Sequence, residues 1–349
     1  MNRPAMRMTR RMGGFSLVEL MVAMTLSLVL LAGALSILYT SKVTYTENER
    51  VARLQEAGRT VVELILRDAR AAGYVGCSRP LRTEDFVNGL AGSGTLPYNL
   101  QQPLLGFDTA PATAGWLPAL DASILNAAPG SDVVAVRSSR QGQPIFRTTG
   151  PVNPLTPGIP VTRAANVVVP TNTPMIISDC RGASVFWPSG VATPTPTTAT
   201  IAHAPGGPPG NTGPSLTRGF EIGAQVTPVQ TVVYYVRIDA VTGLPALWQK
   251  IGANPARPLI EGVENMQITY GEDTTADQLA DRYVTADMVG NWANVISFSI
   301  SILVRSEDET GLDVDNRTYN LLGTNVGPFT DRRQRSVFTT TVTLRNVAT

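Results

Sequence analysis

The chain has 349 residues, of which 43% are hydrophobic and 16% are charged, with 31 glycines and 26 prolines. This composition fits one or two globular domains with long irregular connections and excludes a disordered chain. The formal net charge is +1, but Arg3, Arg7, Arg10 and Arg11 make the first 14 residues basic and leave the rest slightly acidic. The charge therefore does not favour nucleic-acid binding.

An apolar run from Phe15 to Tyr39 follows these arginines. It contains one charged residue, Glu19, and no proline. About 20 to 25 apolar residues at about 1.5 Å each cross a hydrocarbon core of about 30 Å, so we predict a membrane-spanning helix over 15–39. Because short basic segments resist translocation, we expect the arginines to stay cytoplasmic and everything after Lys42 to lie outside the inner membrane.

A cleaved secretory signal and a plain uncleaved anchor are the rival interpretations of this beginning. A cleaved signal fits poorly because the apolar run is long and no A-x-A-like site of small residues follows it. The small pair Gly13 and Gly14 precedes the run instead.

Helix-forming residues continue beyond the apolar run to about Ala72, which predicts one helix about 85 Å long. Residues 40–72 form an amphipathic half, and we expect a domain folded against its apolar stripe. Gly73 marks the expected end of the helix, because glycine accepts the left-handed conformation common there. The stripe comprises Val51, Leu54, Gly58, Val61, Ile65, Ala69 and Ala72.

Residues 73–349 are expected to form a β-rich globular headgroup, with long loops up to about Gly130. Ser297, Ser299 and Ser301 alternate with apolar residues, which predicts a half-buried antiparallel strand. Residues 258–271 indicate a turn or short helix followed by a strand. Further strand signals lie at 131–138, near Val168, near Ile176, before Trp187, at 231–238 and at 336–346.

Residues 187–218 are low in charge and crowded with proline, glycine and threonine. We expect a mobile or extended excursion that buries little, either an exposed contact loop or a tolerated insertion. The chain's single histidine, His203, lies in this excursion and is predicted to be a surface residue.

Catalytic and metal-binding chemistry finds little support. One histidine and two cysteines do not favour a zinc site, and neither G-x-S-x-G nor H-E-x-x-H occurs. We therefore predict no enzyme, no catalytic residue, no cofactor and no metal site. The acidic stretches 271–287 and 306–316 leave calcium binding open, but both lack the spacing of an EF-hand loop, which favours solvated loops.

The two cysteines, Cys77 and Cys180, are expected in an oxidising compartment, which favours a disulfide between them. It would tie the end of the long helix to the sheet region. Closing a loop of roughly 100 residues is worth about 4 to 5 kcal/mol in the chain-entropy model.

The stretch from Gly14 to Glu19, GFSLVE, resembles the processing site of type IV prepilins and type II secretion pseudopilins. The resemblance implies that a prepilin peptidase removes the leader 1–14 by cutting after Gly14 and then methylates the new α-amine of Phe15. It also implies that Glu19 meets the α-amine of a neighbouring subunit during assembly, which offsets the cost of a carboxylate in the membrane. The alternative is that Glu19 only reaches the lipid headgroups.

Other stretches resemble the PilW family of minor pilins: AAGYVGC, SDC, LIEGVENMQITYG, ADRYVTAD and the final YNLLGTNVGPFTDRRQRSVFTTTVTLRN. The resemblance implies an α+β pilin-like fold, a long N-terminal helix packed on an antiparallel sheet. It also implies an inner-membrane subunit with a periplasmic headgroup that primes pilus assembly, sits near the tip and supports twitching motility and adhesion.

The partners implied are other minor pilins, the major pilin, a tip adhesin, the prepilin peptidase and the inner-membrane assembly platform. A headgroup larger than a filament repeat easily accepts favours a rare position near the tip. Three alternatives stay open: a type II secretion minor pseudopilin of the J type, a membrane-anchored surface-binding protein and an anchored hydrolase.

Overall fold

A computed structural model describes residues 14, 16–74, 76, 85–109, 115–139, 142–192, 194–206, 209–213, 216, 218–309 and 313–347. The leader up to Gly13, Phe15 and Cys77 lie outside these described residues. The chain forms two compact units, an amino-terminal unit, Met1–Arg53, and a carboxy-terminal unit, Leu54–Thr349.

The long helix predicted from the sequence is confirmed as α1 (Leu17–Arg70). Its end is stabilised from two distant segments. Gly73, with a φ of 74°, donates its N–H to the Arg137 carbonyl at 3.0 Å. The Asn346 side chain donates to the carbonyls of Arg70 and Ala72 at 3.3 and 3.2 Å, satisfying acceptors that a helix end leaves unpaired.

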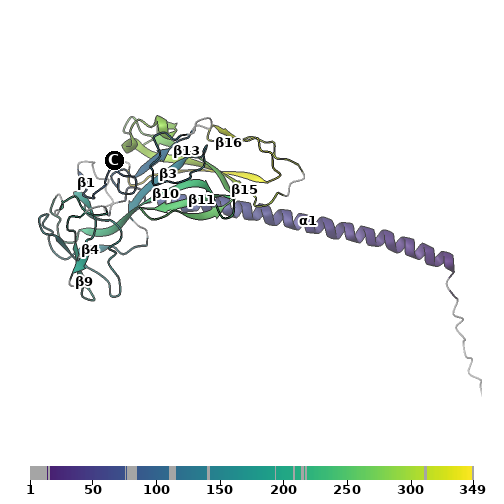
Figure 1. Cartoon of the computed structure of the whole chain (residues 1–349), viewed down its shortest axis with the longest axis horizontal. Helices are drawn as coiled ribbons and strands as arrows, with labels where there is room; N and C mark the ends of the chain where they lie inside the picture. Colours follow the sequence, from purple (N-terminus) through teal and green to yellow (C-terminus); the bar gives the residue numbers. More distant parts are fainter. Residues whose placement is uncertain are drawn as a thin grey trace, which may run out of the picture. The chain divides into compact units, whose positions relative to one another are not determined.

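The first sheet is organised around one long strand, β10 (Gln225–Ile238), as Figure 1 shows. The first residues of β10 lie between β6 and β4, and its later residues lie between β3 and β11. The other strands of this sheet are β1 (Phe86–Asn88), β2 (Leu104–Phe107), β3 (Val133–Ser139), β4 (Phe146–Thr148), β5 (Gly158–Thr162), β6 (Met175–Asp179), β7 (Gly182–Phe186), β8 (Gly190–Ala192), β9 (Thr198–Ala202), β11 (Pro245–Ile251) and β12 (Arg257–Glu261).

The second sheet is antiparallel, with the strand order β14-β13-β15-β18. Its strands are β13 (Val263–Glu272), β14 (Arg282–Val284), β15 (Val295–Arg305) and β18 (Arg335–Thr343). Two short 3-10 helices, Ala286–Met288 and Trp292–Asn294, precede β15, and a hairpin of β16 (Tyr319–Leu321) and β17 (Thr324–Val326) lies between β15 and β18. The α+β fold with antiparallel sheets predicted from the sequence is confirmed.

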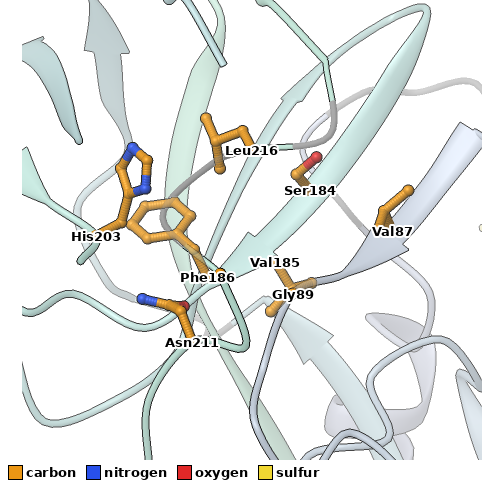
Figure 2. A pocket seen from close by; sticks show the side chains of 9 residues that line it. Val87, Gly89, Ser184, Val185, Phe186, His203, Asn211 and Leu216 are labelled. Atoms are coloured by element: carbon orange, nitrogen blue, oxygen red, sulfur yellow. The ribbon is translucent and has the colours of Figure 1, made fainter. Parts of the chain in front are cut away.

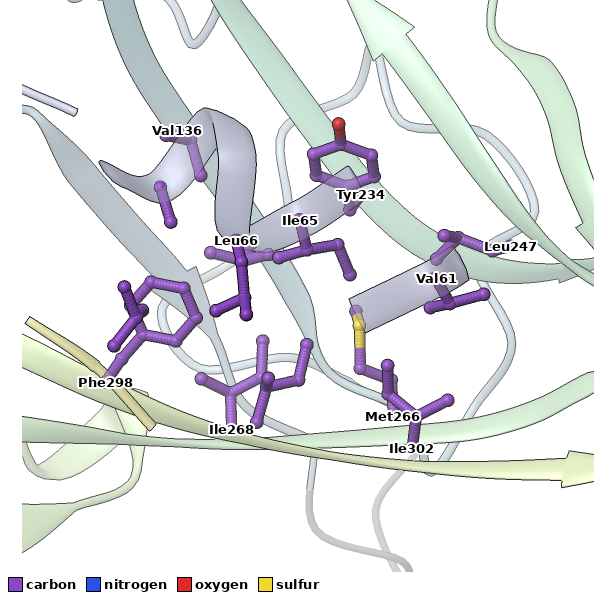
Figure 3. Close-up of a cluster of buried hydrophobic side chains, with 14 of the residues drawn as sticks. Val61, Ile65, Leu66, Val136, Tyr234, Leu247, Met266, Ile268, Phe298 and Ile302 are labelled. Atoms are coloured by element: carbon purple, nitrogen blue, oxygen red, sulfur yellow. The ribbon is translucent and has the colours of Figure 1, made fainter. Parts of the chain in front are cut away.

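The carboxy-terminal end of α1 forms a core with both sheets (Figure 3). Val61 and Ile65 are fully buried among Tyr234 of the first sheet and Met266 and Ile302 of the second. Burying one such aliphatic side chain contributes about 1.5–3 kcal/mol, so this turn of the helix stabilises the two sheets together.

Most of the predicted stripe is buried, namely Leu54, Gly58, Val61, Ile65, Ala69 and Ala72. Gly58 is required by close packing, because a Cβ atom there would collide with the ring of Phe338 in β18. Val51, in the amino-terminal unit, is 40% exposed.

Asp68 is a buried carboxylate on the same helix face that the apolar pattern does not predict. Tyr234 donates its hydroxyl hydrogen to Asp68 at 2.7 Å, and Gln249 donates to the Tyr234 oxygen at 2.9 Å. Arg257 in turn donates to Gln249 at 3.1 Å. Burial, and then the negative charge of Asp68, raises the pKa of Tyr234, so the hydroxyl stays a donor. This chain of hydrogen bonds joins α1 to β10, β11 and β12.

Arg335 is the centre of a charged cluster at the start of β18. Its side chain is fully buried and pairs with Glu264, Asp315 and Asp331 at 2.6, 3.2 and 2.7 Å. The ring of Phe329 lies 3.5 Å from its guanidinium carbon. Asp315, Phe329 and Asp331 belong to the segment between β15 and β18, so the cluster holds that segment against the sheet.

The strand β15 differs from the half-buried strand that its alternation predicts, because its serine face is also buried. Ser297, Ser299 and Ser301 are at most 8% exposed. Ser299 and Ser301 pair with threonine hydroxyls of the neighbouring strand β18, and Ser297 pairs with the hydroxyl of Tyr283 in β14, two strands away. The strand β16 contacts β15 and β18. The alternation in the sequence shows that the second face of β15 is polar, but it does not show whether other segments bury that face.

Residues 258–271 contain parts of β12 and β13, joined by a turn at Gly262, so of the two alternatives predicted there the turn is present and the short helix is not. Two further expectations are wrong. Residues near Val168 form no strand; the β-branched run has no ladder partner among the described residues, and Val168 is 78% exposed. The excursion 187–218 does bury side chains, because β9 pairs with β5 and places Ala199 and Ile201 in a core.

We expect Tyr234→Phe to lower the free energy of unfolding by about 1–3 kcal/mol, because it leaves buried Asp68 without its tyrosine donor. Urea unfolding of the full chain in detergent, followed by tryptophan fluorescence, measures this. Tyr45→Phe, at a 69% exposed tyrosine, is the control and should change stability by less than about 0.5 kcal/mol. Equal effects of the two variants would contradict the role of Asp68.

The Arg335 cluster predicts a loss of stability in acid. Burial raises the pKa of Asp315, but hydrogen bonds from Arg317, Tyr319 and Arg335 outweigh it and bring the pKa to about 2. The unfolded carboxyl titrates near 3.9, so this stabilisation is complete above about pH 4 and is lost as the pH falls towards 2. Urea unfolding across this range should show a loss of about 2 kcal/mol that Asp315→Asn reduces; the same pH dependence in both proteins would refute the assignment.

Candidate assembly site

The first turn of α1 is closed by a reciprocal pair of hydrogen bonds between Ser16 and Glu19. The Ser16 N–H donates to the Glu19 carboxylate at 3.1 Å, and the Glu19 N–H donates to the Ser16 hydroxyl oxygen at 3.2 Å. This is a capping box, in which a serine and a glutamate three residues later satisfy amides that the helix start leaves free. The signal for it, S-x-x-E, is present in the sequence, and sequence reasoning considered only the charge of Glu19.

The capping box gives Glu19 a role inside its own chain. A carboxylate in the first helical turn is also stabilised by the partial positive charge of the helix N-terminus. Both effects offset part of the cost of placing Glu19 beside apolar residues. A glutamine at this position could form the same hydrogen bond without the charge, so capping and charge can be separated by mutation.

Gly14, the residue before the predicted cleavage point, is exposed, and a Cβ atom on it would meet no atom of the described residues within 4 Å. Its neighbour Phe15, the predicted methylation site, lies outside the described residues. Gly14 and Ser16 thus lie directly before α1, and Glu19 lies in its first turn.

The apolar part of α1 is long enough to cross a membrane. An 18-residue window of α1 has a mean hydropathy of 2.3, and none of it is buried within the described part of the chain. Leu17, Leu30 and Tyr39 are each more than 70% exposed. An apolar surface of this size is consistent with a membrane anchor.

The predicted disulfide is described from one side only, since Cys77 lies outside the described residues. Cys180 is exposed in the turn between β6 and β7. Gly76 is buried beside this region, where a Cβ atom on it would lie 2.6 Å from the Ser178 hydroxyl oxygen. Gly76, which precedes Cys77, and Ser178, two positions before Cys180, are thus neighbours. The disulfide itself stays a prediction.

His203 is buried, which corrects the prediction of a surface residue. It is 1% exposed, and its ring lies 5.8 Å from that of Phe186, centre to centre (Figure 2). Burial lowers its pKa, which favours the neutral ring. The strand β9, which the composition does not predict, carries His203 into this position.

The pocket beside His203 is lined by Phe186, Asn211 and Leu216, among others, and has room for about one water molecule. Asn211 uses its side chain to bind the backbone of Trp187 and Ala204. The pocket is too small for an organic substrate. Asn211 is engaged in holding the loop, whereas the buried Nε2 atom of His203 has no hydrogen-bond partner among the described residues.

Two carboxylates of the first acidic stretch accept hydrogen bonds from backbone amides of the stretch itself. Asp273 accepts from the amides of Ala276 and Gln278 at 2.6 and 2.8 Å, and Asp281 accepts from the Thr274 amide at 2.6 Å. In the part of the chain that the structure describes, no group of three or more His, Cys, Asp or Glu residues is placed to hold a metal ion.

Comparison with protein-family models gives two matches. Residues 9–35 match the prokaryotic N-terminal methylation motif, and residues 233–346 match the model described as type IV pilus-assembly protein W, PilW. No curated protein and no solved structure matches the chain. The first match covers Gly14 and Glu19, and the second runs from β10 to beyond β18. Together the matches confirm the resemblance found in the sequence: the start of the chain is similar to the methylation motif, and its carboxy-terminal third is similar to PilW.

Proposed function

We propose that this chain is a minor pilin that primes type IV pilus assembly from the inner membrane and takes a position near the pilus tip. In this role it supports twitching motility and adhesion. The observation that carries the proposal is the start of α1, where a methylation motif, a capped carboxylate and an exposed apolar surface occur together. Pilin-family domains are structural, and we propose no catalytic activity.

The proposed processing begins at Gly14. A prepilin peptidase cuts after this residue, and Phe15 becomes the N-methylated amino terminus. The basic leader stays cytoplasmic before cleavage, because short arginine-rich segments resist translocation, so the headgroup lies in the periplasm and later on the cell surface.

The proposed assembly step pairs Glu19 with the α-amine of Phe15 of a neighbouring subunit. The amine has a reference pKa near 8 and is largely cationic at neutral pH. Two opposite charges in a low dielectric recover much of the cost of leaving water, whereas one alone does not. The capping box holds the carboxylate at the helix start before the partner arrives, and it does not neutralise the charge.

The proposed partners are the other minor pilins, the major pilin, the tip adhesin, the peptidase and the inner-membrane assembly platform. The match to a pilus-assembly family supports a pilus context. A minor pseudopilin of a type II secretion system is the second candidate, since it shares the processing site. Loss of twitching without loss of secretion in a deletion strain distinguishes the pilin from the pseudopilin.

We also propose the Cys77–Cys180 disulfide. The packing of Gly76 beside Ser178 supports it, because it brings the two cysteine-bearing segments together. The link would hold the segment after α1 to the β6–β7 turn in the oxidising periplasm.

Three substitutions separate the two roles of Glu19. We expect Glu19→Gln and Glu19→Ala to lower the amount of this chain in sheared pili at least about tenfold, since both remove the charge that meets the neighbouring amine. Ser16→Ala keeps the charge and removes only one capping bond, so it should assemble nearly as the wild type does. Immunoblots of the sheared and membrane fractions give the measurement.

The amount of processed protein in the membrane is the control and should be equal in all three variants. If Glu19→Gln enters sheared pili normally and Ser16→Ala does not, then assembly requires the capping hydrogen bonds and not the charge. That result would contradict the assembly role proposed for Glu19.

For the disulfide, reduction should lower the free energy of unfolding by about 2–5 kcal/mol. The variant with both Cys77→Ser and Cys180→Ser is the control and should not respond to the reductant. Urea unfolding with and without reductant gives the values. Two alkylated thiols in the chain before reduction, found by mass spectrometry, would disprove the bond.

A further inference from the structure

The strand β18 forms one edge of the second sheet, and its pairing with β15 shows which of its backbone groups point outward. The Leu344 N–H donates to the Ile296 carbonyl at 2.7 Å, and the Ser306 N–H donates to the Gln334 carbonyl at 2.8 Å. Both pairs continue the β15–β18 register. In an antiparallel pair, hydrogen-bonded residues alternate with residues whose N–H and C=O groups point away. The even-numbered residues of β18 therefore bind β15, and Val337, Thr339, Thr341 and Thr343 face outward.

This outward edge is open to solvent. Thr339, Thr341 and Thr343 are exposed, while Val342 between them is buried. Among the described residues, no backbone hydrogen bond from outside the sheet reaches the outward groups of these three threonines. Within the described part of the chain, the edge thus presents a row of backbone amides and carbonyls that have no hydrogen-bond partner and are spaced for another strand.

The edge also lacks the features by which proteins protect exposed strands. Residues 336–344 contain no charged residue and no proline, and the β15–β18 pairing has no bulge. By contrast, β12 carries Pro258 between Arg257 and Leu259, and its pairing with β11 has a register shift, while β14 has only three residues. A long, regular and uncharged edge strand is a template for pairing with another chain.

The side chains beside the edge indicate what would fit there. On one face, hydroxyls form a ladder, since Ser299 lies 2.6 Å from Thr341 and Ser301 lies 2.8 Å from Thr339, oxygen to oxygen. On the other face, Phe338 is half-buried against α1. A strand added here would extend the ladder with serine or threonine on one face and place apolar side chains beside Phe338 on the other.

We propose that the outer edge of β18 is a docking site for an extended, uncharged strand of another protein, with hydroxyl and apolar side chains in alternation. Backbone hydrogen bonds to Thr339, Thr341 and their outward neighbours provide the binding, and the two faces select the sequence. The proposal depends on the second sheet alone and stands whether or not the chain primes a pilus.

The test uses the full chain in detergent micelles and a fluorescein-labelled probe. The probe is a peptide of alternating threonine and valine, capped at both ends and flanked by lysines for solubility. Fluorescence anisotropy should show saturable binding to the wild type. The same peptide with an N-methyl group on the backbone of its central residues should bind at least about tenfold more weakly, because it cannot complete the ladder.

The matched variants change one outward position. Thr341→Pro removes an outward N–H and leaves the β15 ladder intact, so it should bind the probe at least tenfold more weakly. Thr341→Ser keeps the amide and the hydroxyl and should bind as the wild type does. Should the proline variant fail to fold by circular dichroism, Thr341→Lys decides the point, because a charge at the edge opposes pairing without changing the backbone.

Two results would overturn the proposal. One is probe binding that is absent in the wild type or unchanged in Thr341→Pro and Thr341→Lys. The other is concentration-dependent dimerisation of the wild type, seen by sedimentation and abolished by Thr341→Pro, because a second copy of this chain would then occupy the edge.

Discussion

Burial of one face of α1 between two sheets is the constraint on which the rest of the carboxy-terminal unit depends. Val61 and Ile65 are in contact with a core shared by β10 of the first sheet and β13 and β15 of the second. No other helix of comparable length is present among the described residues to close this core. The hydrogen bond from Tyr234 to buried Asp68 is directional, unlike the apolar contacts around it. It therefore restricts the position of the helix against the first sheet.

The amino-terminal end of the same helix has the opposite character. Its apolar side chains are exposed in the single chain, and its one carboxylate is held by a serine at the first turn. A helix that is stabilised by its own sheets at one end and leaves apolar surface uncovered at the other is suited to join a membrane and then other helices. The family match to a methylation motif agrees with this division of α1.

Sequence reasoning succeeded where a pattern is long and local. The spacing of Leu54, Val61, Ile65 and Ala69 predicts the buried face of α1, and the alternation around Phe298 predicts β15. It failed where a distant segment decides the outcome. Pairing of β9 with β5 brings the following residue, His203, into a buried position, and hydroxyls of Tyr283, Thr339 and Thr341 pair with the serines of β15. Neither set of partners is visible in the local sequence.

The candidate site shows the same limit. Glu19 is conspicuous in the sequence because a charge in an apolar run is costly. Its hydrogen bonds with Ser16 follow from the S-x-x-E capping motif, which was not considered in the sequence. The open edge of β18 has no sequence signature apart from the absence of charge and proline. It becomes visible only when the register with β15 shows which amides point outward.

Intact-mass spectrometry of this chain recovered from sheared pili tests the proposed cleavage after Gly14 together with the proposed entry into the pilus. We expect one mature species that begins with N-methylated Phe15 and keeps the whole apolar run. A species that retains the basic leader, or a processed chain found only in the membrane fraction, would contradict it.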